Sequence, residues 1–205
     1  MRISIQILFS LFLISCGNSS TNKVTNDWQG TRWVELNQEE IKLRIPNQFK
    51  RSSRYRIKED LPKLAEDSVK LRLVQNSLKL LEFEDSEIDV FIDTTKTYRM
   101  LIICNTSKID FSSTDIAFLK QQLKADNDQS QIKEPAFQYG EISATLKANQ
   151  THKLARFTTQ IQNKIDKSKV YNSIYYLTGN SFTLIVYEFS KDDDFIEKYL
   201  WTSKT

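Results

Sequence analysis

The segment Lys169–Ser190, KVYNSIYYLTGNSFTLIVYEFS, decides the fold class of this chain. Two runs rich in β-branched and aromatic residues, Lys169–Thr178 and Ser181–Ser190, flank the pair Gly179 and Asn180. Such runs are typical of strands, and the Gly-Asn pair is typical of a tight hairpin turn because both residues tolerate a positive φ angle. The segment therefore predicts two antiparallel strands joined by a short turn.

Outward from this hairpin, alternating apolar residues predict further strands. Residues 41, 43 and 45 are apolar and share one strand face, and Pro46 ends that strand because proline lacks an amide donor. The expected strands are 31–36 with 41–46 as one hairpin, Ser53–Ile57, Ile88–Asp93 with Tyr98–Asn105 as a second hairpin, Phe137–Leu146, and Lys153–Gln162. Because short turns join these strands, we expect a mainly antiparallel sheet.

Three segments show signals of helices. The first begins near Leu61, with a strand as the alternative for 69–73, and the third is a short helix opened by Asp193 and Asp194. The second is Thr114–Ala125, capped by Ser113 and followed by a polar loop over 126–134, with its apolar residues Ile116, Leu119 and Leu123 facing inward. The expected fold class is α+β, with about six to eight strands and about three helices in one domain over 28–205.

The N-terminus resembles a bacterial lipoprotein signal. Residues 3–14 are mostly apolar but shorter than the about 20 apolar residues of a transmembrane helix, which favours a secretory signal peptide over 1–15. The sequence Leu13-Ile14-Ser15-Cys16 resembles a lipobox, in which cleavage precedes the cysteine and Cys16 is acylated. The alternative is an ordinary signal peptide that ends near a cysteine.

The lipobox resemblance implies a place in the bacterial cell envelope. Acyl chains on Cys16 would hold the chain on a membrane, and the polar residues 17–27 would form a flexible tether. Gly17 stands where an inner-membrane retention signal has aspartate, so the outer membrane is favoured, with the domain facing the periplasm or the outside.

The composition excludes several classes of function. The chain has 205 residues with four glycines, one histidine and two cysteines, which excludes glycine-rich phosphate loops, two-histidine metal sites and zinc fingers. Its formal net charge of +3 gives no large field of one sign and no sign of nucleic-acid binding. We therefore expect no cofactor, no metal and no nucleic-acid partner.

No catalytic residue is assigned from the sequence. Ser130 and Lys133 fit an SxxK pattern, but a second match over 20–23 shows that chance produces it in this composition. His152 is expected in an exposed polar turn, and Cys104 is expected to be a buried, inert thiol. Two acidic runs are interpreted without a metal. The run 192–194 is expected at a helix N-terminus, and the acidic residues between 82 and 89 are expected in a solvated turn. A weak metal site is the alternative for each.

A basic run is the candidate binding site. It comprises Lys50, Arg51, Arg54, Arg56 and Lys58. In a strand, Arg54, Arg56 and Lys58 would share one face and could bind phosphate or carboxylate groups of lipid headgroups, polysaccharide or a protein partner. The alternative is an edge strand that charge protects from aggregation.

Two motifs resemble the PsbP-like family. A strand running into Leu43-Arg44-Ile45-Pro46-Asn47-Gln48-Phe49 resembles the family's opening, and the hairpin Phe182–Phe189 followed by 190–194 and a short helix resembles its ending. The resemblance covers most of 31–203 and implies an antiparallel sheet between helices. That family includes small bacterial lipoproteins, a photosystem extrinsic subunit and a GTPase-binding import factor, and it shares no active site. The scarcity of glycine in the turns departs from the family pattern.

These observations favour a lipid-anchored accessory protein that docks onto another envelope component. The alternative is a carrier of a small apolar or anionic ligand in a pocket between sheet and helix; a hydrolase is the least favoured reading. The pocket could be lined by the aromatic residues of the last third, for which core packing is the competing interpretation: Tyr171, Tyr175, Tyr176, Phe182, Tyr187, Phe189 and Trp201.

Overall fold

The computed structural model describes residues 30–36, 41–52, 88–95, 99–191 and 196–203. The strands are β1 (Thr31–Glu35), β2 (Lys42–Pro46), β3 (Phe49–Ser52), β4 (Ile88–Asp93), β5 (Met100–Ser107), β6 (Phe137–Tyr139), β7 (Ser143–Ala148), β8 (Lys153–Asn163), β9 (Lys169–Thr178) and β10 (Phe182–Ser190). The helices are α3 (Ser113–Lys133) and α4 (Glu197–Leu200). The expected strand 53–57 and the helix near 61–81 lie outside the described residues.

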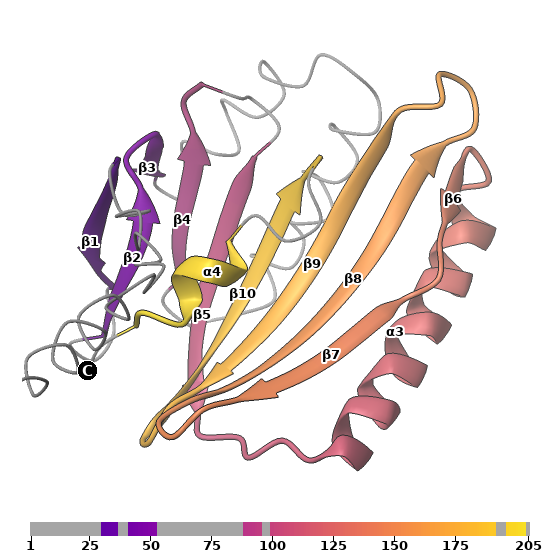
Figure 1. Ribbon diagram of the computed structural model, residues 1–205. Helices are drawn as coiled ribbons and strands as arrows, with labels where there is room; N and C mark the ends of the chain where they lie inside the picture. Colours follow the sequence, from indigo (N-terminus) through magenta and orange to yellow (C-terminus); the bar gives the residue numbers. More distant parts are fainter. Residues whose placement is uncertain (1–29, 37–40, 53–87, 96–98, 192–195, 204–205) are drawn as a thin grey trace, which may run out of the picture.

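The central feature is an eight-stranded sheet in the order β3-β4-β5-β10-β9-β8-β6, with β7 also paired to β8 (Figure 1). Every strand pair within it is antiparallel. The hairpin β9–β10 lies in its middle and is paired from Thr178 with Thr183 to Tyr171 with Ser190. The predicted α+β class and the mainly antiparallel sheet are therefore confirmed.

The first face of the sheet is covered by the β1–β2 hairpin and by the C-terminal segment with α4 (Figure 1). The predicted strand face of β2 is confirmed, since Ile41, Leu43 and Ile45 are at most 1% exposed. Ile196 and Leu200 of the C-terminal segment are fully buried in the same core. Their docking on the sheet agrees with the helix predicted near the C-terminus, whose expected start at 193–194 is not described.

The opposite, second face holds two further apolar clusters. One includes Val90, Ile102 and Ile161. The other joins Ile142 and Phe157 of the β6–β8 region to helix α3. Helix α3 lies along the β6–β7 side of the sheet (Figure 1).

The turn between β9 and β10 contains Gly179 for a reason other than the predicted positive φ angle. The hairpin forms as predicted, but Gly179 does not have a positive φ angle. Among the described glycines, Gly30 has one. A Cβ on Gly179 would lie 2.5 Å from the ring of Phe182, which is 1% exposed. Glycine is therefore required at this turn because an aromatic ring of the core packs on its Cα.

Helix α3 is longer than its predicted range, and the expected loop over 126–134 is wrong. The helix begins after Ser112 instead of Ser113 and continues to Lys133, and Pro135 follows its end. Two hydrogen bonds join its polar second half to the sheet. The side-chain amide of Asn127 in the helix donates to the Thr159 hydroxyl of β8 at 3.3 Å, and the backbone amide of Tyr139 in β6 donates to Oε1 of Gln131 in the helix at 3.2 Å. Because these contacts join segments that are distant in the chain, the sequence of the helix alone does not predict them.

The strand predicted over Phe137–Leu146 is interrupted. Residues 140–142 separate β6 from β7, and both strands pair with the same side of β8. The Gly140 amide donates to the Gln160 carbonyl at 2.8 Å, and a Cβ on Gly140 would lie 3.2 Å from that oxygen. The close backbone approach at the glycine marks the break.

Candidate functional site

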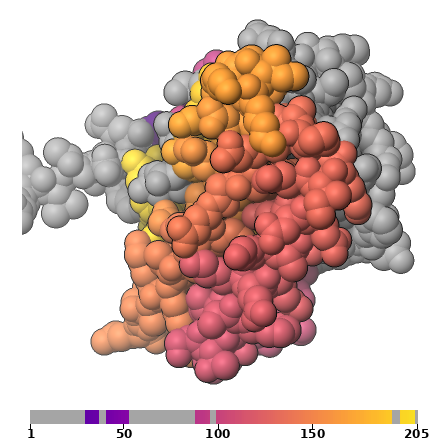
Figure 2. All heavy atoms as spheres, turned by 90° about the vertical axis from the view of Figure 1, so that its right-hand side faces the viewer, coloured from indigo at the N-terminus to yellow at the C-terminus, as the bar shows by residue number. Residues whose placement is uncertain are grey.

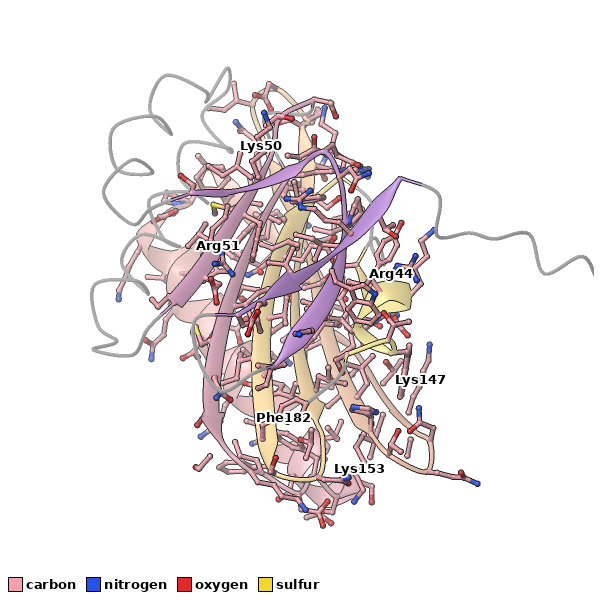
Figure 3. The ribbon with its side chains drawn as sticks, turned by 90° about the vertical axis from the view of Figure 1, so that its left-hand side faces the viewer. Arg44, Lys50, Arg51, Lys147, Lys153 and Phe182 are labelled. Atoms are coloured by element: carbon pink, nitrogen blue, oxygen red, sulfur yellow. The ribbon has the colours of Figure 1, made fainter. Side chains whose placement is uncertain are left out.

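The predicted lipidation site and most of the predicted basic run are not described by the structure. Cys16 lies outside the described residues, as do Arg54, Arg56 and Lys58. Lys50 and Arg51 lie next to each other in β3. Since neighbouring residues of a strand point to opposite faces, these two cations do not form one patch (Figure 3). Binding of an anion or a partner by the run stays a prediction.

Arg51 is held by the protein itself. Its Nε lies 3.1 Å from Oδ1 of Asp89, a carboxylate that is 5% exposed. Its guanidinium lies 5.4 Å from the ring centroid of Phe91 and also donates to the carbonyl of Glu35 in β1. In this arrangement Arg51 balances a buried charge and joins the β1–β2 hairpin to the main sheet.

Two further arginines fasten the same hairpin. Arg32 donates to the carbonyl of Asn47 in the β2–β3 turn, at 2.8 Å, and to the carbonyl of Phe49 in β3. Arg44 donates to the Thr31 hydroxyl at 2.7 Å and lies 5.8 Å from the ring centroid of Trp33. Of the basic residues that the structure describes at this end of the molecule, Arg32, Arg44 and Arg51 therefore make internal contacts.

His152 is half-buried, which corrects the expected exposed turn. Its Nε2 is 3.2 Å from the hydroxyl of Ser203, and its ring packs edge-on against Phe182 with 6.4 Å between centroids. Burial lowers the pKa of His152 below its ordinary value of 6.5. The imidazole therefore joins the β7–β8 turn to the C-terminal segment.

The remaining candidate residues from the sequence lie in the core or in regular helix, as far as the structure describes them. Cys104 is 4% exposed in β5, as predicted, and Ser130 and Lys133 lie in the last turns of α3. The aromatic residues do not line a common pocket, since Tyr175 and Phe182 belong to the core of the first face, whereas Tyr187 and Phe189 pack on the second. Core packing is confirmed for these four rings, whereas Tyr171 is half-buried and belongs to none of the apolar clusters.

A buried ionic network, not foreseen from the sequence, ties the C-terminal segment to the sheet. Glu197 is 7% exposed and forms ion pairs with Arg156, at 2.8 Å, and with Lys147. Next to it, the Tyr175 hydroxyl donates to Oε2 of Glu188 at 2.8 Å. Burial and the neighbouring Glu188 carboxylate strongly raise the pKa of Tyr175, so this phenol remains a donor.

Strand β7 forms an edge of the sheet. In the described part of the chain it pairs with β8 alone. Its sequence, SATLKA, holds a single charge, Lys147, and that ammonium group is paired with Glu197. Leu146 is 38% exposed beside this edge. Edge strands are usually protected by charge, proline or a covering element, and β7 has neither a proline nor an unpaired charge.

A surface groove of about 440 Å³ adjoins this edge, between α3 and the β6–β7 connection. Its lining comprises Lys120, Lys124, Asn127 and Asp128 of α3 with Tyr139, Gly140, Glu141 and Ile142. Figure 2 views the molecule from this side, where α3 and the β6–β7 segment meet at the surface. The Nζ of Lys120 is 3.9 Å from Glu141 Oε1, so positive and negative groups are mixed in the groove.

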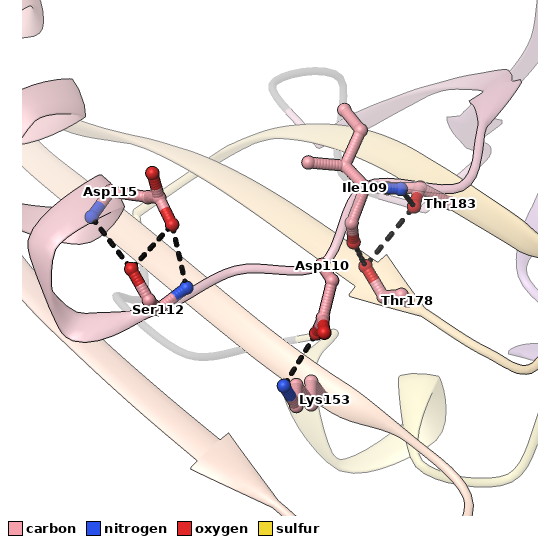
Figure 4. A network of polar contacts seen from close by, with 7 residues as sticks. All are labelled: Ile109, Asp110, Ser112, Asp115, Lys153, Thr178 and Thr183. Carbon is pink, nitrogen blue, oxygen red and sulfur yellow. Dashed lines mark hydrogen bonds and ion pairs between the residues drawn. The ribbon is translucent and has the colours of Figure 1, made fainter.

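The start of α3 is fixed by a polar network (Figure 4). The hydroxyl of Ser112 and the carboxylate of Asp115 form a capping box, in which the Ser112 amide donates to Asp115 Oδ2 at 2.8 Å. The preceding segment is held to β9 and β10, because Thr178 donates to the Ile109 carbonyl at 2.8 Å and the Ile109 amide donates to Thr183 at 2.8 Å. These contacts set the position of α3 beside the β7 edge.

The described residues contain no group of three or more His, Cys, Asp or Glu side chains placed to hold a metal ion. Within the same residues, neither helix has the length and apolar composition needed to cross a bilayer.

Comparison with known proteins identifies the fold. No family model matches the sequence, and neither does any curated protein. The solution structure of cyanobacterial PsbP (CyanoP) from Synechocystis sp. PCC 6803 matches with a TM-score of 0.51 and 13% sequence identity, over 94% of this chain and 98% of that chain. The chain has a PsbP-like fold. The resemblance suggested by 43–49 and by the C-terminal hairpin is confirmed at this level, and the PsbP-like fold assigns no active site to the residues described above.

Proposed function

We propose that this protein is a non-enzymatic docking module of the bacterial cell envelope, anchored through acyl chains on Cys16. The observation that supports docking most strongly is the β7 edge: among the residues that the structure describes, this strand pairs with β8 on one side only. The partner is an extended segment of another envelope protein that adds to the sheet as a further strand.

The edge suits this mode of binding for three reasons. Main-chain hydrogen bonds supply affinity in strand addition, and alternate side chains supply specificity. Leu146 offers an exposed apolar contact next to the strand. Lys147 is paired with Glu197, so it repels an incoming segment less than an unpaired ammonium group would.

Site-specific photo-crosslinking in intact cells tests the docking edge. A photoreactive residue placed at Leu146 is expected to capture one defined protein band. The matched control is Ile165, an 81% exposed apolar residue in the turn between β8 and β9, which should not capture that band. Equal capture from both positions, or none from Leu146, would overturn the proposal.

A substitution completes this test. Leu146→Lys adds a positive charge at an exposed position, so the fold should be retained while capture from a second photoreactive position at Ala148, which is also exposed, is lost. Undiminished capture in this variant would place the binding surface elsewhere.

The anchor is tested separately by cell fractionation. The Cys16→Ala variant is expected to leave the membrane fraction because it cannot be acylated. A variant that remains with the membranes would contradict the anchor without affecting the docking edge.

The groove beside α3 supports a second candidate, a carrier of a small anionic ligand. Lys120 and Lys124 lie one helical turn apart in its wall and could together bind a phosphate or carboxylate group. Titration with inorganic phosphate, followed by NMR shifts of the groove residues, is expected to show binding that the Lys124→Gln variant loses. Shifts that are unchanged in that variant would dismiss this function.

A further inference from the structure

Two apolar side chains of this protein are exposed far more than the others. Among the described residues, Ile132 and Ile165 are each 81% exposed, whereas the other four exposed large apolar side chains are 37–58% exposed. Single exposed apolar residues are common on protein surfaces, so exposure alone indicates no function. These two residues differ because they lie at the same end of the molecule.

The chain brings Ile132 and Ile165 together from two distant segments. Ile132 lies in the last turn of α3, and Ile165 lies in the turn between β8 and β9. The Lys164 amide of that turn donates to the Ala136 carbonyl at 2.8 Å, which joins the turn to the segment that follows α3. Figure 1 shows the end of α3 and the β8–β9 turn at one end of the sheet.

We define the isoleucine tip as residues 132–136 and 164–169. Its charged residues are four lysines and two carboxylates, which give a net charge of +2: Lys133, Lys164, Lys167, Lys169, Glu134 and Asp166. The four lysines are exposed, and none of them forms an ion pair within the described part of the chain. The Asp166 carboxylate accepts from the Ser168 amide and hydroxyl, at 2.9 and 2.6 Å. The tip therefore combines two exposed isoleucines with an excess of positive charge.

The lysine at position 167 is not explained by the backbone conformation. Lys167 has a φ angle of 62°, in the left-handed region that favours glycine and asparagine over lysine. Its amide donates to the Asn163 carbonyl at 3.0 Å and closes the turn. A cation thus occupies an exposed position of the turn against the local backbone preference, which is consistent with a use for its charge.

The turn can enter a less polar environment without leaving its amides unpaired. The amides of Lys164, Ile165, Lys167 and Ser168 donate to acceptors inside the protein, and the acceptor for Ile165 is Oδ1 of Asn163, at 2.9 Å. Backbone groups without a partner are costly in contact with lipid. A turn whose amides are already satisfied is therefore suited to a bilayer surface.

We propose that the isoleucine tip is a membrane-contact site, which inserts Ile132 and Ile165 among the headgroups of an anionic bilayer while its lysines bind lipid phosphates. Apolar side chains are stabilised by leaving water at the interface, and lysine stems lie along apolar surface while their ammonium groups stay with the phosphates. The positive tip and the negative phosphates are complementary. This contact goes beyond the function proposed above, because it uses neither the Cys16 anchor nor the β7 edge.

Contact through the tip differs from α3 lying flat on the membrane. Phe118 is 58% exposed and lies about 21 Å along the helix from Ile132. Between them lie the exposed carboxylates of Asp126 and Asp128, which an anionic bilayer repels. The proposal therefore places Ile132 and Ile165 in contact with lipid and Phe118 in water.

Fluorescence quenching by lipid tests this orientation. In the full chain with Cys16→Ser, the remaining thiol is the buried Cys104, so a fluorophore attaches to a cysteine placed by Ile165→Cys, Ile132→Cys or Phe118→Cys. The vesicles contain phosphatidylglycerol, phosphatidylcholine and a lipid that carries a quencher near its headgroup. Quenching should be about fivefold greater at 165 and 132 than at 118, and should be lost in vesicles without phosphatidylglycerol. Because each probe reports its own surroundings, binding through another part of the chain does not reproduce this pattern.

A pair of lysine variants tests the charge of the tip. Lys164→Gln combined with Lys167→Gln should reduce quenching of the probe at Ile132→Cys by about fivefold, because two contacts with lipid phosphate are lost. The matched control, Lys120→Gln combined with Lys124→Gln, removes the same charge from α3 outside the tip and should leave this quenching nearly unchanged.

An isoleucine variant tests the apolar contact. Ile165→Ser should reduce quenching at Ile132→Cys by about fivefold, whereas Ile165→Leu should retain it, because leucine keeps the apolar side chain. Position 165 is 81% exposed, so both variants should keep the fold.

The proposal is overturned by equal quenching at 118 and 165, by equal quenching in anionic and neutral vesicles, or by undiminished quenching in the variant of Lys164 and Lys167. If a photoreactive residue at 165 captures a protein band in intact cells while vesicles give no quenching, the tip binds a protein and the membrane proposal fails. Capture from Leu146 tests the β7 edge separately, so the two proposals can fail independently.

Discussion

Several charged side chains in this protein position strands and segments. Arg51 holds β3, β4 and the β1–β2 hairpin together by contacting Asp89 and the Glu35 carbonyl. Arg156 links β8 to the C-terminal segment through Glu197. Because such groups lose hydration on burial, each must be satisfied by a partner, and removing one partner costs more than an exposed ion pair would suggest.

The Tyr175 phenol is the clearest single contact to test. Tyr175→Phe removes the donor to Glu188, a carboxylate that is 2% exposed, so the free energy of unfolding should fall by about 1–3 kcal/mol. Urea denaturation measures the change. Tyr171→Phe, on the same strand but half-buried, is the control and should cost less. Equal losses in the two variants would contradict the assigned role of Glu188.

His152 predicts a defined dependence of stability on pH. Since burial lowers its folded pKa below 6.5, the unfolded chain binds a proton more readily than the folded chain. The contribution of His152 to stability is therefore complete above about pH 6.5 and decreases as the pH falls from there through the folded pKa. His152→Gln should reduce the loss of unfolding free energy measured between about pH 7.5 and pH 5.

Three aspartates with shifted pKa values titrate outside the pH range of that measurement. The pKa values of Asp110, Asp115 and Asp166 are lowered from 3.8 by hydrogen bonds to Lys153, Ser112 and Ser168, respectively. These carboxylates titrate below the window used for His152. Parallel pH profiles for the wild type and His152→Gln would contradict the assignment to this histidine.

At the scale of elements, tertiary contacts decide where α3 ends and where the β6–β7 strand breaks. The second half of α3 is rich in polar residues that are common in loops, and its hydrogen bonds to Thr159 and Tyr139 keep it helical. The break at 140–142 leaves β7 as a short separate edge strand. Local propensity predicted neither, because both depend on residues distant in sequence.

The β9–β10 turn gives a test at this scale. Gly179→Ala places a methyl group against the ring of Phe182, which the core holds in place, so the unfolding free energy should fall by about 1–3 kcal/mol. Differential scanning calorimetry measures it. The neighbouring Asn180→Ala is exposed and should change stability little. If both variants are neutral, Phe182 can move aside and the steric explanation is wrong.

At the scale of the whole molecule, the C-terminal segment is an integral layer of the fold. Ile196 and Leu200 fill the core of the first face, and Ser203 reaches His152 at the β7–β8 turn. Glu197 fastens the same segment to β7 and β8. The segment therefore supports the strand that is proposed to bind a partner.

Glu197→Gln tests this coupling. It leaves the largely buried Arg156 without its carboxylate and should lower the unfolding free energy by roughly 3 kcal/mol. Hydrogen exchange should increase in residues 196–203 and in β7. The control Glu141→Gln breaks an exposed ion pair with Lys120 and should cost less than about 0.5 kcal/mol. Unchanged exchange in β7 would show that the segment does not support this edge.

The candidate site was only partly accessible from sequence. The basic run predicts a binding face, but Arg51 is occupied by internal contacts. The sequence predicts one strand over Phe137–Leu146, where the structure has β6 and the separate edge strand β7. Each of these features depends on which residues lie next to one another in space.

The sequence by itself determined the α+β class, the hairpins and the buried strand faces, because alternation and turn residues act over short distances along the chain. Tertiary structure alone decided the length of α3, the position of β7 at an edge of the described sheet, the steric need for Gly179 and the ionic network at Glu197. Those features arise from contacts between segments distant in the chain, and local patterns do not encode the partner of a buried charge or of an aromatic ring.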